Sequence, residues 1–497
     1  MQDALEVLVI AQSIKNTFAP VNRIPPEVLS LIPDYCKTDE ELVALTHVCR
    51  RWRAIFISRA SLWTSLNCTS YARTRAYLER SRTSPLMIRI EQEQWGPHIS
   101  DEAFQLMISH VGRIKALTLS APKDTVHWHT QDLVSPAPLL ERLEIRVKDQ
   151  GTAAPEPFEL FSGDLPSLRE LLLCGIVTNL PRQNVSNLTT FDFRQTSNIE
   201  ISIAHLLAFF ESAHLLREIK LMGSLAYSSD ALPDQILSLP HLRLLRIRDQ
   251  RAHSVLLNHL HIPTGASVTL EFECSDEDRP IQDYLPRSLE NLGNISHITS
   301  INLDFGSWKT SLRLNGPSGG MYMIGTWEDE HQILPSLRVF PLSTVERLSI
   351  TGHEALADPE TEGLDHRQTL LLADNLRTLT LTGLQNLPFI LALNPGHNAS
   401  DTVVCPKLEE FVLYIQRQGD ESCIEALSEM AKERASRGAK LSTVVIVCPQ
   451  ELIAAEGMFG LDSCVSHVER RLYEKLPEWD DVPGEVSGIA DIGKWWD

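Results

Sequence analysis

Residues 23–66 read RIPPEVLSLIPDYCKTDEELVALTHVCRRWRAIFISRASLWTSL, and this stretch decides how the chain begins to fold. Pro25 and Pro26 precede Glu27, and proline suits the first turn of a helix, where the N–H that it lacks would be unpaired anyway. Thr38 is followed three residues later by Glu41, which predicts a second helix that begins with a capping box. The stretch therefore predicts two or three short helices.

The second predicted helix is amphipathic. Its apolar residues recur at steps of three and four, so they are expected to share one helix face. They are Leu42, Leu45, Val48, Cys49, Trp52, Ile55 and Phe56. A further apolar anchor follows at Ser61-Leu62-Trp63. A helical unit this small rarely buries enough surface to be stable alone, so we expect it to dock on another surface.

The same residues resemble an F-box. That family has a Pro-Glu start, a first helix rich in Leu and Ile, a Leu…Val-Cys-Arg-Arg-Trp helix and then Ser-Leu-Trp. The matching residues here are Pro26-Glu27, Leu29, Leu31, Ile32, Leu42, Val48-Cys49-Arg50-Arg51-Trp52 and Ser61-Leu62-Trp63. The resemblance implies binding to the SKP-family adaptor of a cullin–RING ubiquitin ligase.

The resemblance also gives candidate site residues, which serve either adaptor docking or the core of the F-box itself. Sequence alone does not separate these two roles. The candidates are Pro25, Leu29, Ile32, Leu42, Leu45, Val48, Cys49 and Trp52. Pro33 departs from the family pattern, because a bulky apolar residue is usual there. A proline inside a helix costs about 3 kcal/mol, so we expect the first helix to end early or to kink near Pro33.

Charge is distributed unevenly along the chain. The net charge is −20, which opposes non-specific binding to nucleic acid or to an anionic membrane. Arginines nevertheless gather between positions 50 and 82, where Glu79 is the only acidic residue. They are Arg50, Arg51, Arg53, Arg59, Arg73, Arg75, Arg80 and Arg82. They form either a solvated helix face or a patch that steers an acidic partner. The F-box resemblance favours the second interpretation, with Arg50, Arg51 and Arg53 as its centre, because SKP-family adaptors are acidic.

Cysteine usage bears on the cellular compartment. The chain has nine cysteines and no Cys-x-x-Cys pair, which indicates neither a disulfide framework nor a zinc site. We expect reduced core cysteines, such as Cys174, Cys274 and Cys448, in a cytoplasmic or nuclear protein. The N-terminus has Asp3 and Glu6 where a secretory signal would be basic, and no apolar stretch approaches the ~18 residues of a membrane span.

The chain divides into five predicted parts. Residues 1–20 form an N-terminal helix with Leu5, Leu8 and Ile14 on one side, either a packing helix, which we favour, or the end of a coiled coil. The other parts are the F-box at 21–67, a connecting helix within 68–84, a repeat region at 85–470 and an acidic, aromatic tail at 471–497. The tail is expected either to cap the last repeat, as solenoids require, or to serve as a short linear motif.

The repeat region carries one recurring template, apolar-x-x-apolar-x-apolar. Its copies start mostly 20–33 residues apart, and the 56-residue gap after Leu242 contains a degenerate copy at Val268 and Leu270. The copies begin at Ile114, Leu140, Leu168, Leu188, Leu216, Leu242, Ile298, Val345, Leu376, Leu408 and Leu441. Such spacing is typical of leucine-rich-repeat-like solenoids, in which each repeat gives one strand of a parallel sheet.

Ordinary strands of an α/β fold are the alternative, but the regular spacing favours the solenoid. Ile176 and Leu384 occupy places where standard repeats have asparagine, so the repeats are irregular. The predicted fold class is therefore α/β, with an all-helical F-box followed by an irregular leucine-rich-repeat-like solenoid whose strands return through helices or loops. This architecture is similar to that of the expanded fungal F-box family.

Two insertions interrupt the repeats. Residues 311–324, within a segment at 305–335, alternate around a Gly-rich turn and predict a β-hairpin. A polar, acidic loop follows at 351–366, and insertions of this kind often carry binding.

No catalytic site is expected. Gly316-Pro-Ser318-Gly-Gly320 fits Gly-x-Ser-x-Gly, but the strand expected after it suits a turn and not a nucleophile elbow. His127 and His129 have no further zinc ligands nearby in the sequence and are interpreted as surface or core histidines. We therefore expect a non-catalytic protein without a cofactor or metal, which neither binds nucleic acid nor enters a membrane.

Two functions remain open. The first is the substrate-recognition subunit of an SCF-type ubiquitin ligase, in which the F-box docks on the adaptor and the solenoid binds a protein substrate. The alternative is a scaffold for protein–protein interaction unrelated to ubiquitin, in which the helical segment caps the solenoid.

Overall fold

The structure is a computed structural model of the chain. It describes residues 7, 10–12, 14–16, 18–36, 38–93, 98–148, 158–176, 178–180, 184–195, 201–223, 225–226, 235–249, 253–272, 281–305, 309–325, 336–352, 366–382, 386–397, 402–415, 421–448 and 456–472. The chain forms two compact units, Met1–Pro263 and Thr264–Asp497. The loop at 353–365 and most of the predicted tail lie outside the described residues.

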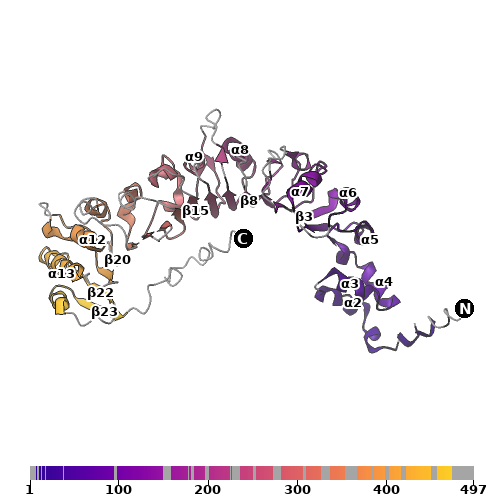
Figure 1. The fold of residues 1–497 in the computed structure, drawn as a ribbon, viewed down its shortest axis with the longest axis horizontal. Helices are drawn as coiled ribbons and strands as arrows, with labels where there is room; N and C mark the ends of the chain where they lie inside the picture. Colours follow the sequence, from indigo (N-terminus) through magenta and orange to yellow (C-terminus); the bar gives the residue numbers. More distant parts are fainter. Residues whose placement is uncertain are drawn as a thin grey trace. The chain divides into compact units, whose positions relative to one another are not determined.

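The first unit opens with short helices, shown at the N-terminal end in Figure 1. In chain order they are η1 (Pro20–Arg23), α2 (Pro26–Leu29), η2 (Ile32–Tyr35), α3 (Asp39–Thr46), α4 (Arg50–Ser58) and η3 (Ala60–Trp63). The predicted capping box is confirmed, because the Glu41 backbone N–H donates to Thr38 Oγ1 at 3.3 Å and Thr38 N–H donates to Glu41 Oε2 at 3.4 Å.

The prediction of one amphipathic helix from Leu42 to Phe56 is wrong. Helix α3 ends at Thr46, and α4 begins only at Arg50, after Cys49 has taken an extended conformation. The β-branched residues at this break are weak helix formers: Thr46 ends α3, with its hydroxyl donating to the Val43 carbonyl at 2.7 Å, and Val48 lies between the two helices. Val48 is 55% exposed and does not share the buried face.

The prediction for Pro33 is confirmed. Helix α2 stops after one turn at Leu29, and the 3-10 helix η2 begins at Ile32, so that Pro33 lies in the first turn of a new helix. A proline is tolerated there because no backbone N–H is needed. Pro33 is buried, so it also contributes apolar surface to this part of the chain.

Residues before the F-box stretch show little packing where they are described. Val7, Ile10, Ile14 and Phe18 are all more than half exposed. Leu5 and Leu8, which were expected to share a side with Ile14, lie outside the described residues, so the choice between a packing helix and a coiled coil stays a prediction.

The predicted connecting helix is α5 (Tyr71–Ser81), and the predicted first strand is β2 (Leu86–Glu91). A two-residue strand, β1 (Ser65–Leu66), pairs parallel with β2 and was not predicted. The connecting helix thus leads from the end of the helical segment directly into the sheet.

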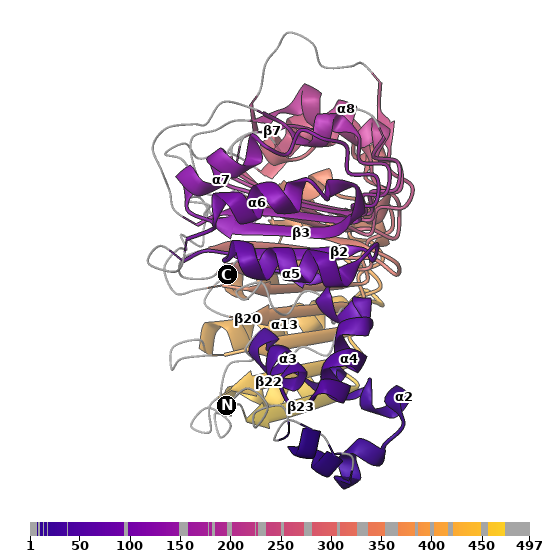
Figure 2. The same cartoon turned by 90° about the vertical axis from the view of Figure 1, so that its right-hand side faces the viewer.

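The sheet of the first unit is parallel, and its strands pair in sequence order. After β1 and β2 come β3 (Ile114–Ala121), β4 (Arg142–Val147), β6 (Glu170–Cys174), β8 (Thr190–Arg194), β10 (Glu218–Met222) and β13 (Leu244–Arg248). The helices that accompany these strands lie on one side of them in Figure 1. Figure 2 shows the first three of these helices stacked along the unit. They are α5, α6 (Asp101–Ile108), α7 (Lys123–Thr130), α8 (Ile203–Ser212) and α9 (His253–Asn258).

The return segments of this unit also pair with one another. Three small parallel pairs join β5 (Phe158–Glu159) to β7 (Thr178–Asn179), β9 (Ile201–Ser202) to β11 (Leu225–Ala226), and β12 (Leu237–Ser238) to β14 (Leu260–His261). The segments that connect the main strands are therefore paired with one another, as the main strands are.

The second unit contains a mostly parallel sheet with one antiparallel strand. In spatial order its strands are β15 (Ser267–Phe272), β18 (Gly320–Gly325), β17 (Thr310–Asn315), β16 (Ser300–Phe305), β19 (Arg347–Thr351), β20 (Thr378–Thr382), β21 (Glu410–Tyr414), β22 (Thr443–Cys448) and β23 (His467–Leu472). Helices α12 (Asn386–Leu393) and α13 (Glu421–Ser436) lie on one side of the last strands in Figure 1.

The predicted hairpin is confirmed as β17 and β18, with Ser318 in the turn between them. The glycines here permit close approach of backbones: a Cβ on Gly319 would lie 2.4 Å from the Thr264 carbonyl oxygen. Ser318 Oγ lies 3.4 Å from the same carbonyl oxygen, which it can donate to. The Gly-x-Ser-x-Gly sequence is thus a hairpin turn, as the following strand predicted.

The apolar template accounts for the core of both sheets. In every copy the second and third apolar residues lie in a strand, and all three are buried, as in Leu168, Leu171 and Leu173. The degenerate copy at Val268 and Leu270 forms β15. The described chain is thus mixed α/β, with an N-terminal helical segment and large sheets that are mainly parallel.

Candidate functional site

The helical segment at the N-terminus has its own small core. Leu29, Trp52 and Phe56 form its buried centre, and the Trp52 and Phe56 rings meet edge to face with centroids 5.5 Å apart. The half-buried side chains around this centre are Ile24, Ile32, Leu45, Cys49, Ile55 and Leu62. The core draws on α2, η2, α3, α4 and η3, so each short helix is fixed by the others.

Hydrogen bonds from buried indoles extend this core. Trp52 Nε1 donates to Asn22 Oδ1 at 2.9 Å, and the Asn22 amide donates to the Asn16 carbonyl at 2.7 Å. Trp63 Nε1 donates to the Phe56 carbonyl at 2.9 Å. The sequence did not lead us to predict this role of Asn22. A signal for it was present, because a buried indole needs a hydrogen-bond acceptor and Asn22 directly precedes the stretch that begins at Arg23.

The structure separates the candidate docking and core residues by burial. Leu29, Leu42 and Trp52 are at most 7% exposed, whereas Ile32, Leu45 and Cys49 are half-buried. Pro25 and Val48 are exposed. The buried residues hold the segment together, and the exposed ones face solvent, where a partner could contact them.

Apolar residues outside the predicted set are also exposed on this segment. Val28 and Leu31 are 51% and 52% exposed and lie one helical turn apart, and Tyr35 is 85% exposed. We call Val28, Leu31, Tyr35 and Val48 the exposed apolar set. A segment with so small a core that leaves several large apolar side chains in water has the character of an interaction surface.

Several arginines of the predicted basic patch are engaged within the chain. Arg51 donates to the Ile24 carbonyl at 2.7 Å, and Arg59 pairs with Asp34 at 3.0 Å and also donates to the Ser30 carbonyl. These contacts tie α4 to the end of η1, and tie Arg59, which follows α4, to the end of α2 and to η2. Arg50 and Arg53, the other two predicted centres of the patch, are exposed.

The remaining arginines connect the segment to α5. Arg73 pairs with Asp39 at 2.6 Å and with Glu40 at 3.2 Å. Hydrogen bonding to the Glu40 backbone N–H and to the Arg73 side chain lowers the pKa of the Glu40 carboxyl. Arg75 pairs with Glu79 on the same helix at 2.8 Å. Arg59, Arg73 and Arg75 are therefore paired with carboxylates of the chain itself, and steering of an acidic partner stays a prediction centred on Arg50, Arg51 and Arg53.

The F-box stretch also packs on α5 through aromatic contacts. The fully buried Trp63 ring meets Tyr77 edge to face with centroids 5.0 Å apart, and the Arg80 guanidinium lies 4.3 Å from the Trp63 ring centroid. The helical segment is thus joined to the sheet of its own unit by a packed contact.

Other candidate sites show structural roles. His129 is 3% exposed, and its ring lies 4.1 Å from the Phe104 ring, so it is a core histidine, as interpreted. Burial of Cys68 and Cys405 raises the pKa of each thiol to about 12, so neither is a reactive thiolate. Cys448 is buried and Cys174 half-buried, whereas Cys274 lies outside the described residues.

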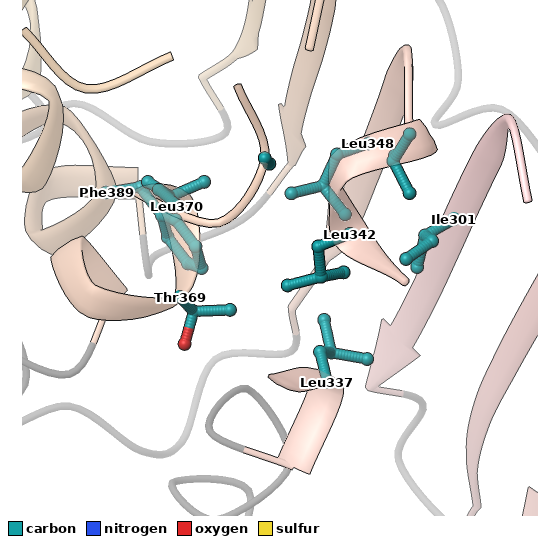
Figure 3. A pocket seen from close by; sticks show the side chains of 9 residues that line it. Ile301, Leu337, Leu342, Leu348, Thr369, Leu370 and Phe389 are labelled. Atoms are coloured by element: carbon teal, nitrogen blue, oxygen red, sulfur yellow. The ribbon is translucent and has the colours of Figure 1, made fainter. Parts of the chain in front are cut away.

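A small apolar cavity lies in the second unit, between β16, β19 and the helical segments nearby (Figure 3). Ile301, Leu342, Leu348 and Phe389 are among its lining side chains, and it has about 10 Å³ of space for a water-sized sphere. It would barely hold one water molecule and is a packing defect of the core. Within the described part of the chain, no helix has both the length and the apolar character needed to cross a membrane.

Comparison with known proteins gives one family match, and it falls on the N-terminal helical segment. No curated protein matches the chain. Residues 21–69 match the F-box-like family, and this range covers the small core, the exposed apolar set and Trp63, whose aromatic partner Tyr77 lies beyond it. An F-box implies a role in SCF-type ubiquitin ligases as the part that binds the SKP-family adaptor, and F-box proteins are typically non-catalytic. The N-terminal helical segment of this chain is thus an F-box-like domain.

Proposed function

We propose that the chain is the substrate-recognition subunit of an SCF-type ubiquitin ligase. The F-box-like domain docks on the SKP-family adaptor, and the sheet region binds a protein substrate. The observation that carries this proposal is the F-box-like match at residues 21–69, which coincides with a domain that exposes apolar side chains. The chain itself makes and breaks no bond; it raises the concentration of substrate near the ligase.

The exposed apolar set is the proposed docking surface, together with Pro25. Covering apolar surface contributes roughly 25 cal/mol per Å², so several half-exposed large side chains supply a useful part of an interface. Leu29, Trp52 and Phe56 act indirectly, because they hold the short helices in place under that surface.

The packing of Trp63 on Tyr77 and the Arg73 ion pairs support the receptor role. They fix the F-box-like domain to α5 and to the first strands, so an adaptor bound at one end and a substrate on the sheet would be held at a limited range of distances. A flexible link would spread the substrate over a larger volume and lower its effective concentration.

We further propose that the sheet region is an irregular leucine-rich-repeat-like solenoid, related to the architecture of fungal F-box proteins. In support, strands pair in sequence order and successive returns also pair. A tight turn recurs before the strands, in which the first apolar residue donates to the carbonyl three residues earlier, as at Leu168, Leu188 and Leu216. Such a region offers a long strand face for a protein ligand.

The compartment proposed for this function is the cytoplasm, the nucleus or both. Among the described residues the cysteines are free thiols, which is typical of a reducing compartment. Imaging of the tagged chain tests this, and accumulation in the secretory pathway would contradict it.

Pull-down with a purified SKP-family adaptor tests the function. The wild-type chain should bind, and Leu31→Asp should abolish binding because it places a charge in the proposed interface. Tyr35→Ala should weaken binding, whereas Tyr71→Ala, which truncates a 45% exposed tyrosine on α5, is the matched control and should not. Circular dichroism should show that these exposed substitutions leave the fold intact.

Variants of the buried residues serve a different purpose. Trp52→Ala and Leu42→Ala should also abolish binding, but by unfolding the F-box-like domain, since both side chains are buried. If the folded wild-type chain does not bind the adaptor, the ligase function is wrong and a scaffold unrelated to ubiquitin becomes the better explanation.

A further inference from the structure

The face of the first unit's sheet opposite its apolar core has an uneven charge distribution. Successive side chains of a strand point to opposite faces, so residues next to the buried Ile145, Leu173, Phe193, Leu221 and Ile247 belong to the outer face. Strand register then arranges these outer residues in rows that cross the strands.

One of these rows, at the fifth strand position, contains arginine on every second strand. From β4 to β13 its members are Arg146, Cys174, Arg194, Met222 and Arg248, each directly paired with the next. We call Arg146, Arg194 and Arg248 the arginine row. No acidic residue belongs to it from β4 to β13, although the chain as a whole has a net charge of −20.

The acidic residues nearest to the row lie deeper in the face. Glu144 and Asp192 precede Arg146 and Arg194 by two residues, and their side chains are 12% and 6% exposed. The arginines are more accessible, at 41% for Arg146 and 18% for Arg194. The ion pairs, 2.7 Å for Arg146 with Glu144 and 2.9 Å for Arg194 with Asp192, hold each guanidinium from below.

These ion pairs orient the guanidinium groups of Arg146 and Arg194. A guanidinium carries five N–H donors in a fixed plane, so one such group can donate to more than one carboxylate. Hydrogen bonding to Asp192 raises the pKa of Arg194, which stays charged under all physiological conditions.

The equivalent row of the second unit has a different character. From β16 to β23 its paired members are Asp304, Thr351, Thr382, Tyr414, Val447 and Arg471, so it has one acidic residue and a single arginine, at opposite ends, and no alternating arginines. The arginine row is thus a property of the first unit's sheet, and it is not a consequence of the repeat template.

The spacing of the arginine row fits one kind of ligand. Strands lie about 4.8 Å apart, so arginines on alternate strands are about 9.6 Å apart. A polyproline II segment rises about 9.3 Å in each turn of three residues. Its side chains at positions i, i+3 and i+6 therefore match the arginines, whereas same-face side chains of a β-strand repeat at about 6.7 Å and do not.

We propose that the arginine row binds an acidic segment of the substrate protein, extended across the strands, with a carboxylate at every third residue. This deepens the proposed function, because it names the substrate class that the sheet would receive. It assigns the first unit's outer face as the interaction surface, with Arg194 at its centre.

Fluorescence anisotropy with the full chain tests this proposal. The probe is a labelled peptide, (Glu-Pro-Pro)₃, and the matched control is Pro₃-Glu₃-Pro₃, which has the same composition and charge. The spaced peptide should bind at least about fivefold more tightly, since it can pair with three arginines at once. Equal affinities for both peptides, or no binding of either, would overturn the proposal.

Variants locate the binding surface. Arg146→Gln should weaken binding of the spaced peptide about fivefold. Arg142→Gln, on the same strand and face but in another row, should leave it unchanged. Arg194→Gln is combined with Asp192→Asn, so that no buried carboxylate loses its partner, and should also weaken binding about fivefold. If Arg142→Gln weakens binding as much as Arg146→Gln, the row is not the site.

Two further probes decide what kind of ligand the row accepts. If (pSer-Pro-Pro)₃ binds and the glutamate peptide does not, the ligand is a phosphorylated segment and the carboxylate assignment is wrong. If the oligonucleotide dT9 displaces the peptide at similar concentrations, the row is an unselective anion site and its assignment to an acidic protein segment is wrong. These peptide assays contain no adaptor, so a failure of peptide binding would overturn the arginine-row proposal without bearing on adaptor binding. A failure of the adaptor pull-down would likewise leave the peptide result unchanged.

Discussion

In the F-box-like domain, short helices are joined by side chains that are far apart in the sequence: Trp52 to Asn22, Trp63 to Tyr77, Arg59 to Asp34. In the parallel sheet of the same unit, one apolar template recurs on strand after strand, and each strand pairs with the next. Each contact in the helical domain is thus individual, whereas each contact in the sheet is one of many equivalent ones. The two regions should respond differently when a single side chain is removed.

The largest expected effect is in the helical domain. Trp63→Ala removes the aromatic contact with Tyr77, the cation–π contact with Arg80 and the hydrogen bond to the Phe56 carbonyl. It should lower the free energy of unfolding by about 3–5 kcal/mol. Trp128→Ala, which truncates a 62% exposed tryptophan on α7, should change it by less than about 0.5 kcal/mol. Urea unfolding followed by circular dichroism measures both, and similar effects of the two would contradict the assigned role of Trp63.

The sheet should show a smaller and more local loss. Leu171→Ala creates a cavity at a side chain that is 1% exposed, with an expected cost of about 2–4 kcal/mol. Leu172→Ala, on the next residue and the opposite face, should cost clearly less because Leu172 is only half-buried. Hydrogen exchange should place the weakened amides of Leu171→Ala near β4, β6 and β8, and loss of protection throughout the unit would break the comparison.

Loss of one polar link tests whether the helical domain depends on individual contacts. Asn22→Ala leaves the buried Trp52 indole N–H without its acceptor and should cost about 1–3 kcal/mol. Asn187→Ala removes a bond from an exposed side chain to the Pro166 carbonyl and should cost less. Thermal unfolding monitored by tryptophan fluorescence compares the two variants, and equal losses would argue against a special role of Asn22.

The capping box is expected to contribute less. Thr38→Ala removes the acceptor for the Glu41 backbone N–H and should cost about 1 kcal/mol. Thr38→Ser keeps the hydroxyl and should retain most of the stability, as measured by urea unfolding. If the serine variant loses as much as the alanine variant, the methyl group and not the cap is responsible.

The smallest expected effect is a pH dependence of the free energy of unfolding, caused by His129 of α7 beside the parallel sheet. Burial lowers the pKa of His129 below its usual 6.5, although Asp101 and Asp132 partly offset this. The unfolded chain then binds a proton more readily than the folded chain, so His129 should reduce stability as the pH falls below about 6.5. His129→Gln should flatten this dependence between pH 7 and 5, and an unchanged slope would show that other groups cause it.

The sequence carries much of the fold because its signals are local. The prolines and the capping box predicted where α2 and α3 begin, and the apolar template predicted the core positions of the main strands. The break at 47–49 was missed because apolar steps of three and four fit one long helix as well as two short ones. The two-residue strand β1 is too short to show any periodicity.

The candidate site was less predictable, because it depends on which side chains the fold covers. Leu31 and Ile32 are neighbours of similar chemistry, yet Leu31 is 52% exposed and Ile32 joins the small core. Asn22 meets Trp52 across 30 residues, which no spacing pattern reports. The arginine row likewise exists only through strand register, since its members are about fifty residues apart in the sequence.

The hairpin of the second unit has a consequence for how this architecture can vary. It places two strands between β15 and β16, and because β17 runs against the others and β18 runs with them, β15 and β16 keep the same direction. Two antiparallel pairings, β18 with β17 and β17 with β16, cancel each other, whereas an odd number of antiparallel pairings would reverse β16 and the strands beyond it relative to β15. A chain of this kind can therefore gain or lose whole hairpins at such a point while its later strands remain parallel, and the sheet can lengthen in steps of two.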